Sequence, residues 1–397
     1  MSSEDRENLW ILKEHSKVKH EIFEKYLRRF ISIVGRYWSE FYYIDGFAGR
    51  GRYRNDELGS PLRSIQTITR VLNSPTLQMN VRKIKCIFIE KDKENCDILK
   101  ENLDKITYLK NQRGLEVECI QDSFNDAFWK IRENNYNGLS QNPSFFFIDP
   151  YGYSQVPFRI IKEIFELSRV KGRPEIFLNL MVGSISRFYK DVTKANLMRD
   201  LFGNGDWQKD IDDLLTTWPI EPCEAISRYY RDQIESTTRA KYTLRYKFKN
   251  KNTNQWIYDM IHATTNIKGL MVMKDVMYNI GVRGTFEFHG RCEKMLRNTM
   301  DLFQFFKQDP KQQNLRKWLL KFIGPNEVLT FDSLNEIIYL HTNEIEKTLR
   351  NTLKLMESKG EIEINRKKSK KTGINGEDQI KFKTSRGKRE KPLFSNN

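Results

Sequence analysis

The segment FYYIDGFAGRG, residues 41–51, decides the fold that this sequence predicts. Its first four residues form an apolar run typical of a buried strand that ends at Asp45, and glycines follow at Gly46, Gly49 and Gly51. Glycine lets the backbone adopt conformations closed to other residues and approach a ligand closely. A Ser-Pro pair at residues 60–61 then marks the start of a helix. This arrangement is typical of a nucleotide pocket, and a tight turn without a ligand is the alternative.

The pattern of short apolar runs and amphipathic segments continues on both sides of this loop. The expected strands are 41–45, 84–89, 115–120, 144–149 and 175–180, and the expected helices lie near 60–72, 92–105, 124–134 and 157–168. Strands that are apolar throughout and alternate with helices indicate a parallel sheet covered on both faces. We therefore expect an α/β, doubly wound sheet.

The flanking regions complete one large domain. Residues 1–40 read as an N-terminal helical segment, and 184–240 read as a helical insertion. Alternating apolar residues predict two further strands, at 242–249 and 256–264, which would close the sheet as an antiparallel hairpin. A doubly wound sheet that ends in such a hairpin is the usual architecture of S-adenosylmethionine (SAM) dependent methyltransferases. The expected Rossmann-like methyltransferase domain spans 41–300.

The C-terminal part has a different pattern. Residues 310–365 read as helix, short strand, two helices and strand, which resembles a winged helix. Its second long helix would expose Lys347, Arg350 and Lys354 to nucleic acid, while a helical protein-interaction module is the alternative. Residues 366–397 predict a basic, disordered tail, because 11 basic and only 3 acidic residues lie between residues 366 and 391.

Charge favours a polyanionic partner. The chain of 397 residues has a formal net charge of +16, and the basic excess is not confined to the tail. Basic side chains also lie on one face of the strand near 242–249, at Lys241, Arg245, Lys247 and Lys249. We expect these residues to bind a nucleic-acid backbone, DNA or RNA; a solvated, solubilising surface is the alternative.

Other classes of protein are disfavoured by composition. Five scattered cysteines without a CxxC pair indicate neither a disulfide frame nor a zinc ribbon, and we expect no metal site. No run approaches the roughly 18 apolar residues of a membrane span. The N-terminal decapeptide is polar and lacks the apolar core of a secretion signal. These features predict a soluble, cytoplasmic protein.

Cofactor-binding residues are expected around the glycine loop. Glu90 ends the second strand, where an acidic residue suits the two hydroxyls of a ribose. Asp122 follows the third strand and would accept the adenine amino hydrogens; a simple helix cap is the equal alternative. The predicted cofactor site comprises Glu90 and Asp122 together with the loop residues Asp45, Gly46, Phe47, Ala48, Gly49 and Gly51.

Catalytic residues are expected after the fourth strand, at Asp149, Pro150 and Tyr151. A carboxylate and an aromatic ring at the carboxyl edge of a parallel sheet would hold and stack an exocyclic amine. A tight turn with a buried capping aspartate is the alternative. Asn179, at the end of the fifth strand, would line the same cleft or satisfy a turn. Cys223 follows a proline, like the nucleophile of cytosine-C5 methyltransferases, but stands away from the fourth strand, so we expect a structural role.

Taken together, these motifs resemble the three-Cys-motif partner (TcmP) proteins, a family with a SAM-methyltransferase-like fold. The matching stretches are YIDGFAGRGRY at 43–53, GSPL at 59–62, FIEKD at 88–92, FFFIDPYG at 145–152, FLNLM at 177–181 and HATTNIKGLMVMKDVMYNI at 262–280. The resemblance implies a bacterial or phage setting and a radical-SAM-like partner that carries the cysteines. DPYG departs from the Asp-Pro-Pro-aromatic motif of amino-methyltransferases, because its aromatic residue comes one position early.

Two hypotheses follow. The first is a SAM-dependent methyltransferase that acts on nucleic acid at a base nitrogen, in which positioning is the main catalytic requirement. The second is a non-catalytic subunit that keeps the fold, binds nucleic acid or a partner, and works with the radical-SAM-like protein.

Overall fold

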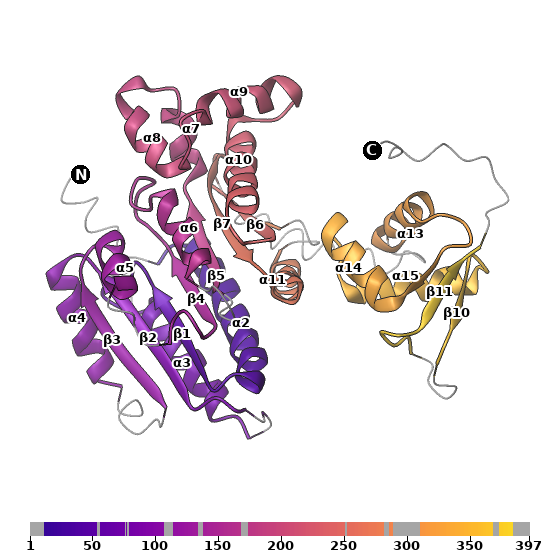
Figure 1. The fold of residues 1–397 in the computed structure, drawn as a ribbon, viewed down its shortest axis with the longest axis horizontal. Helices are drawn as coiled ribbons and strands as arrows, with labels where there is room; N and C mark the ends of the chain where they lie inside the picture. The colour runs from indigo at the N-terminus through magenta and orange to yellow at the C-terminus, as the bar shows by residue number, and fades with distance from the viewer. Residues whose placement is uncertain are drawn as a thin grey trace. The chain divides into compact units, whose positions relative to one another are not determined.

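The computed structural model describes residues 12–53, 56–75, 77, 79–106, 114–133, 138–167, 174–250, 252–281, 286–288, 310–367 and 373–383. The chain divides into two compact units (Figure 1). The first comprises residues 1–280 and 286–291, and the second comprises 281–285 and 292–397. Within the described ranges, none of the helices is long and apolar enough to cross a membrane.

The first unit is built on an eight-stranded sheet with the order β3-β2-β1-β4-β5-β7-β6-β8. Strands β1 to β5 are mutually parallel, β7 runs antiparallel to both β5 and β6, and β8 pairs parallel with β6. The strands are β1 Glu40–Asp45, β2 Lys83–Glu90, β3 Leu115–Gln121, β4 Ser144–Ile148, β5 Pro174–Leu180, β6 Tyr242–Lys249, β7 Trp256–Thr264 and β8 Glu287–Phe288. This is the strand order of a Rossmann-like methyltransferase fold, so the predicted parallel sheet and closing hairpin are confirmed.

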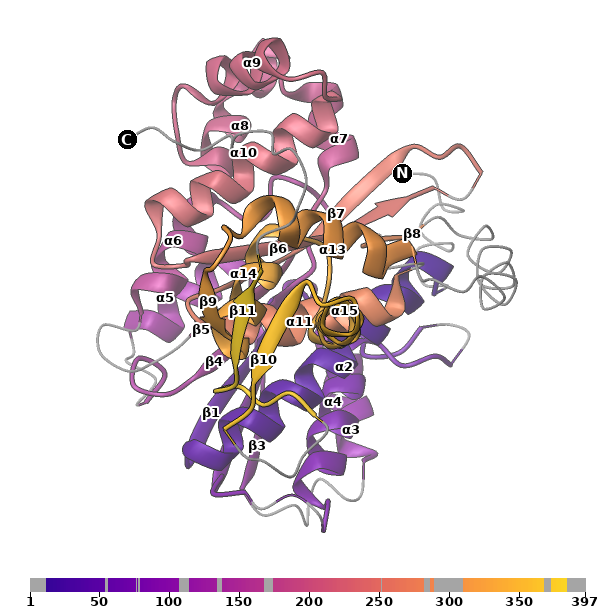
Figure 2. The ribbon, with the colours of Figure 1, turned by 90° about the vertical axis from the view of Figure 1, so that its right-hand side faces the viewer.

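Helices cover both faces of this sheet (Figure 2). One face packs against α2 Glu14–Tyr37, α3 Ser60–Leu72, α4 Lys93–Asp104 and α11 Ile267–Ile280. The other packs against α5 Phe124–Glu133, α6 Phe158–Glu166 and the helical region between β5 and β6, with α7 Val182–Phe188, η2 Val192–Lys194, α8 Ala195–Phe202, α9 Trp207–Thr217 and α10 Pro222–Thr237. The predicted helices and the helical insertion are confirmed.

The two cores follow from the period of two along each strand. On β4, Phe145 and Phe147 point to the α2 face, whereas Phe146 and Ile148 point to the α5 and α6 face. Helix α2 seals its side with an apolar stripe, and the rings of Phe23 and Phe147 lie 4.6 Å apart. Because every one of these strand residues is buried, the sheet edge beyond them is a rigid platform for a site.

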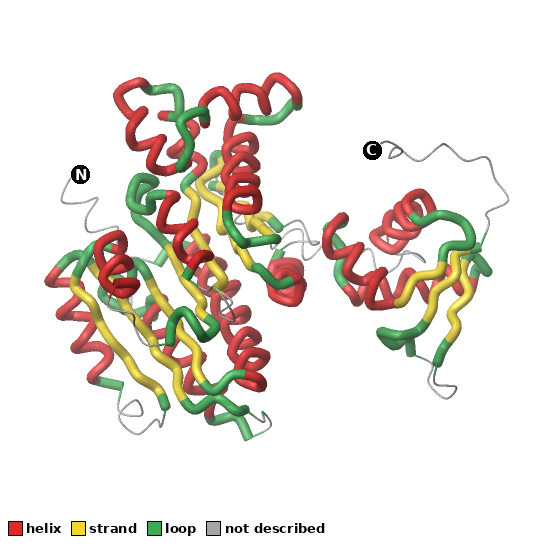
Figure 3. The backbone as a smooth tube through the Cα atoms, in the orientation of Figure 1, coloured by secondary structure: helices red, strands yellow, loops and turns green. Residues whose placement is uncertain are grey.

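In its described residues, the second unit holds three helices and a small antiparallel sheet with the order β10-β11-β9 (Figure 3). Its elements are α13 Pro310–Phe322, β9 Val328–Thr330, α14 Phe331–His341, α15 Glu346–Ser358, β10 Ile362–Asn365 and β11 Gln379–Phe382. The prediction of a disordered tail from residue 366 is wrong for β11, because Ile380 and Phe382 are buried and complete the sheet. Residues 384–397 lie outside the described residues.

Candidate active site

A cavity of about 780 Å³ opens at the edge of the first unit's sheet where the parallel strands end. This volume lies within the usual range for small-molecule sites. The order of the strands reverses between β1 and β4, which is where α/β sheets bind ligands. The residues that surround the cavity come mainly from the start of α2, the loop after β1, the ends of β4, β5 and β6, and the start of β7.

The glycine loop forms one wall of this cavity, through Phe47, Ala48, Gly49 and Gly51. Gly49 and Gly51 adopt φ values of +61° and +79°, in the left-handed region that favours glycine. The loop is anchored on both sides, since the Gly46 amide donates to the Phe147 carbonyl and the Ala48 amide to the Ile89 carbonyl, both at 2.9 Å. The glycines are therefore needed for the shape of this wall.

Asp45 lies directly beneath the loop and is fully buried. The Phe47 amide donates to its Oδ1 at 3.2 Å and the Tyr43 hydroxyl to its Oδ2 at 3.4 Å. Burial raises the pKa of Asp45 to about 7, against the opposing effect of the hydrogen bonds from Ser60 and Phe47, and the charge of Asp149 adds to the rise. Asp45 therefore supports the loop and can change its charge near neutral pH.

Glu90 and Asp122 lie behind the glycine loop rather than in the cavity wall that the described residues form. The buried Glu90 carboxylate accepts the Gly49 amide on Oε2 and the Asp92 amide on Oε1, each at 2.8 Å. Asp122 accepts the Ser123 amide at 2.8 Å and the Lys130 ammonium at 2.5 Å. Glu90 therefore fixes the loop directly, and Asp122 is paired at the start of α5.

Asp149 borders the cavity, but both of its oxygens already have partners. The Lys19 ammonium pairs with Oδ2, and the Asn179 amide nitrogen donates to Oδ1 at 2.8 Å. Pro150 and Tyr151 line the same wall. The Tyr151 hydroxyl reaches over the glycine loop, since a Cβ added at Gly49 would lie 3.3 Å from it. The structure thus brings Asp149, Pro150, Tyr151 and the glycine loop together.

The opposite wall comes from α2 and β7 and was not predicted from the sequence. Lys19 and His20 are buried at the cavity, and His15 lies edge-on to the Tyr258 ring at 5.7 Å. Burial, reinforced by the charges of Lys19 and Lys13, lowers the pKa of His15 to about 4. One signal was present: Lys19 lies four residues before Phe23 and so shares its inward-facing side of the helix.

Three buried polar atoms around this cavity have no hydrogen-bond partner among the residues that the structure describes. They are His20 Nδ1, Asn179 Oδ1 and the Tyr258 hydroxyl oxygen. Leaving such an atom unpaired in a folded protein costs about 1–3 kcal/mol. Unpaired atoms that share one cavity indicate a site prepared for a polar ligand.

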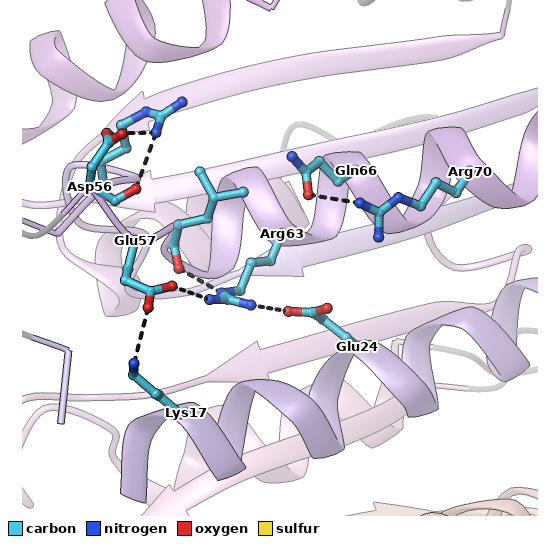
Figure 4. Close-up of polar contacts among 9 residues, drawn as sticks. Lys17, Glu24, Asp56, Glu57, Arg63, Gln66 and Arg70 are labelled. Atoms are coloured by element: carbon cyan, nitrogen blue, oxygen red, sulfur yellow. Dashed lines mark hydrogen bonds and ion pairs between the residues drawn. The ribbon is translucent and has the colours of Figure 1, made fainter. Parts of the chain in front are cut away.

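Helix α2 is tied to the loop segment beyond the glycines by a chain of ion pairs (Figure 4). Arg63 of α3 contacts Glu24 of α2 at 2.5 Å and Glu57 at 3.4 Å, and Lys17 of α2 contacts Glu57 at 3.0 Å. Arg63 also donates to the Leu58 carbonyl at 2.6 Å. The wall that carries Lys19 and His20 is therefore fixed relative to the glycine loop.

The predicted basic strand is largely neutralised. Arg245 pairs with Glu224 at 2.7 Å, Lys247 pairs with Glu287 at 2.8 Å, and Lys249 lies 3.8 Å from Glu287. Lys241 is exposed. These contacts leave β6 less cationic than the sequence alone indicates.

On α15 of the second unit, Lys347 and Lys354 are exposed on one face. Arg350 instead pairs with Glu346 at 2.6 Å and donates to the Ile374 carbonyl. Cys223 lies at the start of α10 with its sulfur 3.8 Å from the Val182 carbonyl oxygen, outside the set of cavity residues in the described part of the chain. Lys347 and Lys354 are therefore, with Lys241, the predicted basic residues that are exposed.

No family model matches this sequence, and none of the curated proteins matches it. The chain is similar in structure to the O-methyltransferase from Bacillus cereus in complex with SAH, with 16% identity, a TM-score of 0.31, and coverage of 61% of this chain and 80% of that one. TomG, an O-methyltransferase from Streptomyces achromogenes in complex with SAM, shows 11% identity and a TM-score of 0.32, with coverage of 62% of this chain and 80% of that one. The putative methyltransferase yhhF from Escherichia coli shows 13% identity and a TM-score of 0.26, with coverage of 43% of this chain and 71% of that one. These likenesses concern the general fold.

Proposed function

We propose that this protein is a SAM-dependent methyltransferase that acts on nucleic acid, at a base nitrogen. The observation that carries the proposal is the cavity of about 780 Å³ that joins the left-handed glycine loop to the Asp149 edge of the sheet. In a doubly wound sheet, this is the position where a cofactor and a second substrate can meet.

The residues present fit SAM. The glycine loop supplies a close backbone wall without bulky side chains, and Glu90 holds Gly49 in place. The two Glu90 oxygens each accept one backbone amide, from Gly49 and Asp92, so Glu90 would act by shaping the loop that holds SAM. Bound SAM would supply an activated methyl group for transfer to a substrate lone pair, with S-adenosylhomocysteine and a proton as the other products. The chain itself needs chiefly to position the substrate.

The nucleic-acid part of the proposal rests mainly on the second unit. Its helix, strand, helix, helix and two strands follow the order expected of a winged helix, in which α15 would be the recognition helix. Lys347 and Lys354 are exposed there, and the chain carries a net charge of +16. Such charge favours a polyanion.

A non-catalytic binding subunit is the second candidate. The observation in its favour is that Asp149, the expected holder of the amine, has both oxygens engaged by Lys19 and Asn179. Membership of the TcmP family, with a radical-SAM-like partner, belongs to this proposal and rests on the motifs at 43–53, 88–92 and 145–152.

Transfer of labelled methyl from SAM to DNA, RNA and protein tests the proposal. We expect incorporation into nucleic acid, removed by Asp149→Ala while SAM binding persists. SAM binding without transfer to any polymer would favour the binding subunit instead. Incorporation into protein alone would contradict the nucleic-acid assignment.

A further inference from the structure

The orientation of the Asn179 side chain is fixed by its neighbour. An ionised carboxylate can only accept hydrogen bonds, so the amide that faces Asp149 Oδ1 at 2.8 Å must present its NH2 group. Lys19 pairs with the other oxygen of Asp149, Oδ2. The remaining atom of the amide, Asn179 Oδ1, is therefore directed away from Asp149.

Asn179 Oδ1 has no donor among the residues that the structure describes, although Asn179 is only 7% exposed and borders the cavity. Asn179 is the last but one residue of β5, and its backbone is held in register with Met260 of β7. The acceptor is thus rigidly placed as well as unpaired. A ligand that donates a hydrogen bond here removes the cost of the unpaired atom, and a ligand without a donor does not.

The surroundings of Asn179 favour a neutral donor group. Lys19 places a positive charge beside Asp149, and its side chain is buried, with only 7% of it exposed. His20 and Tyr258 line the same cavity, and the buried, unpaired Nδ1 and hydroxyl that they carry are each able to hydrogen-bond a neutral polar group. An ammonium group would meet Lys19, whereas an amino group on an aromatic ring is uncharged.

We propose that Asn179 Oδ1 is the acceptor that binds the exocyclic amino group of the substrate base, and that Asp149 is a positioning residue that orients Asn179. This inference rests on the proposed function and specifies its substrate class as an amino-bearing base, such as cytosine or adenine. Asp149 thereby acts through its neighbour instead of holding the amine itself. The consequence is a preference for bases that carry the amino group over otherwise identical bases that lack it.

Calorimetry on the full chain saturated with S-adenosylhomocysteine tests this proposal. The probes are two matched pairs of nucleosides: cytidine with pyrimidin-2-one riboside, and adenosine with purine riboside. The second member of each pair lacks only the amino group. We expect at least one amino-bearing nucleoside to bind about tenfold or more tightly than its partner, as a lost hydrogen bond in a prepared site would give.

Two variants locate the effect. Asn179→Ala should bind S-adenosylhomocysteine as the wild type does and lose the preference for the amino group. Asn279→Ala is the matched control, because Asn279 is exposed on α11 and its side chain donates to the Asp275 carbonyl of its own helix, at 2.6 Å. It should keep the preference in full.

The outcomes separate the two proposals. Failure of S-adenosylhomocysteine to bind the wild type would overturn the proposed function itself. Normal cofactor binding without any preference between the paired nucleosides would overturn the role of Asn179 and leave the cofactor site standing. A preference that survives in Asn179→Ala would likewise refute the assignment to this residue. Because the wild-type comparison alone can refute the inference, a poorly folded variant does not rescue it.

Discussion

The ion pair between Lys19 and Asp149 provides a quantitative test of the architecture of the site. The Lys19 side chain is 7% exposed and that of Asp149 is 21% exposed. Removing one partner of a buried pair costs about 3–5 kcal/mol. Asp149 would keep the hydrogen bond from Asn179 and some contact with water, so we expect Lys19→Met to cost about 2–3 kcal/mol. Methionine retains the apolar stem, which isolates the effect of the charge.

Chemical denaturation of the first unit's transition measures this cost. Lys25→Met is the matched control on the same helix, because Lys25 pairs with Glu21 at 2.6 Å while both side chains are about half exposed. Such an exposed pair is worth at most about 0.5 kcal/mol. In the double variant Lys19→Met/Asp149→Asn, much of the loss should be recovered, since no buried charge is left unpaired. If Lys19→Met costs no more unfolding free energy than Lys25→Met, the buried ion pair between Lys19 and Asp149 does not stabilise the site as argued.

Three further predictions concern other parts of the molecule. Because the folded pKa of Asp45 is raised to about 7, its contribution to stability is full below pH ~4 and falls as pH rises. Relative to Asp45→Asn, the wild type should lose about 2 kcal/mol of unfolding free energy between pH 5 and 7. The same pH dependence of unfolding free energy in both proteins would contradict this. Arg63→Ala should lower the unfolding free energy by about 1–2 kcal/mol, since the charged hydrogen bonds of Arg63 join α2 to α3. Arg70→Ala, at an exposed position, should cost under about 0.5 kcal/mol. Equal costs would refute the role of Arg63 in holding the two helices together. Replacing Lys347 and Lys354 together by Glu should reduce the salt slope of DNA binding by about 2, and an unchanged slope would exclude α15 from the interface.

The sheet could be predicted because its strands carry their own signal. Runs such as residues 145–148 are apolar throughout and are buried on both faces, so local sequence and final environment agree. The loop conformation was also readable, since Gly49 and Gly51 do adopt left-handed backbone angles. The β11 strand was missed inside a lysine-rich stretch, although Ile380 and Phe382 alternate with lysines there.

The polar part of the site depends on partners that are distant in sequence. Lys19 is buried because Asp149, 130 residues away, offers it a carboxylate. The charge of β6 likewise depends on residues distant in sequence, because Glu224 and Glu287 neutralise Arg245 and Lys247. A charge pattern within one strand cannot reveal such pairs, because they are formed only by the tertiary fold.

Calorimetric titration with SAM tests the central claim most directly, with Gly49→Ala and Gly360→Ala compared against the wild type. Both glycines have left-handed φ values, +61° and +71°, so alanine brings a similar strain of roughly 1–2 kcal/mol at each. Only Gly49 lies in the proposed SAM wall, whereas Gly360 belongs to the second unit. We predict binding to the wild type, affinity about tenfold weaker in Gly49→Ala, and wild-type affinity in Gly360→Ala. No binding to the wild type at millimolar SAM, or equal affinity in all three proteins, would contradict the account.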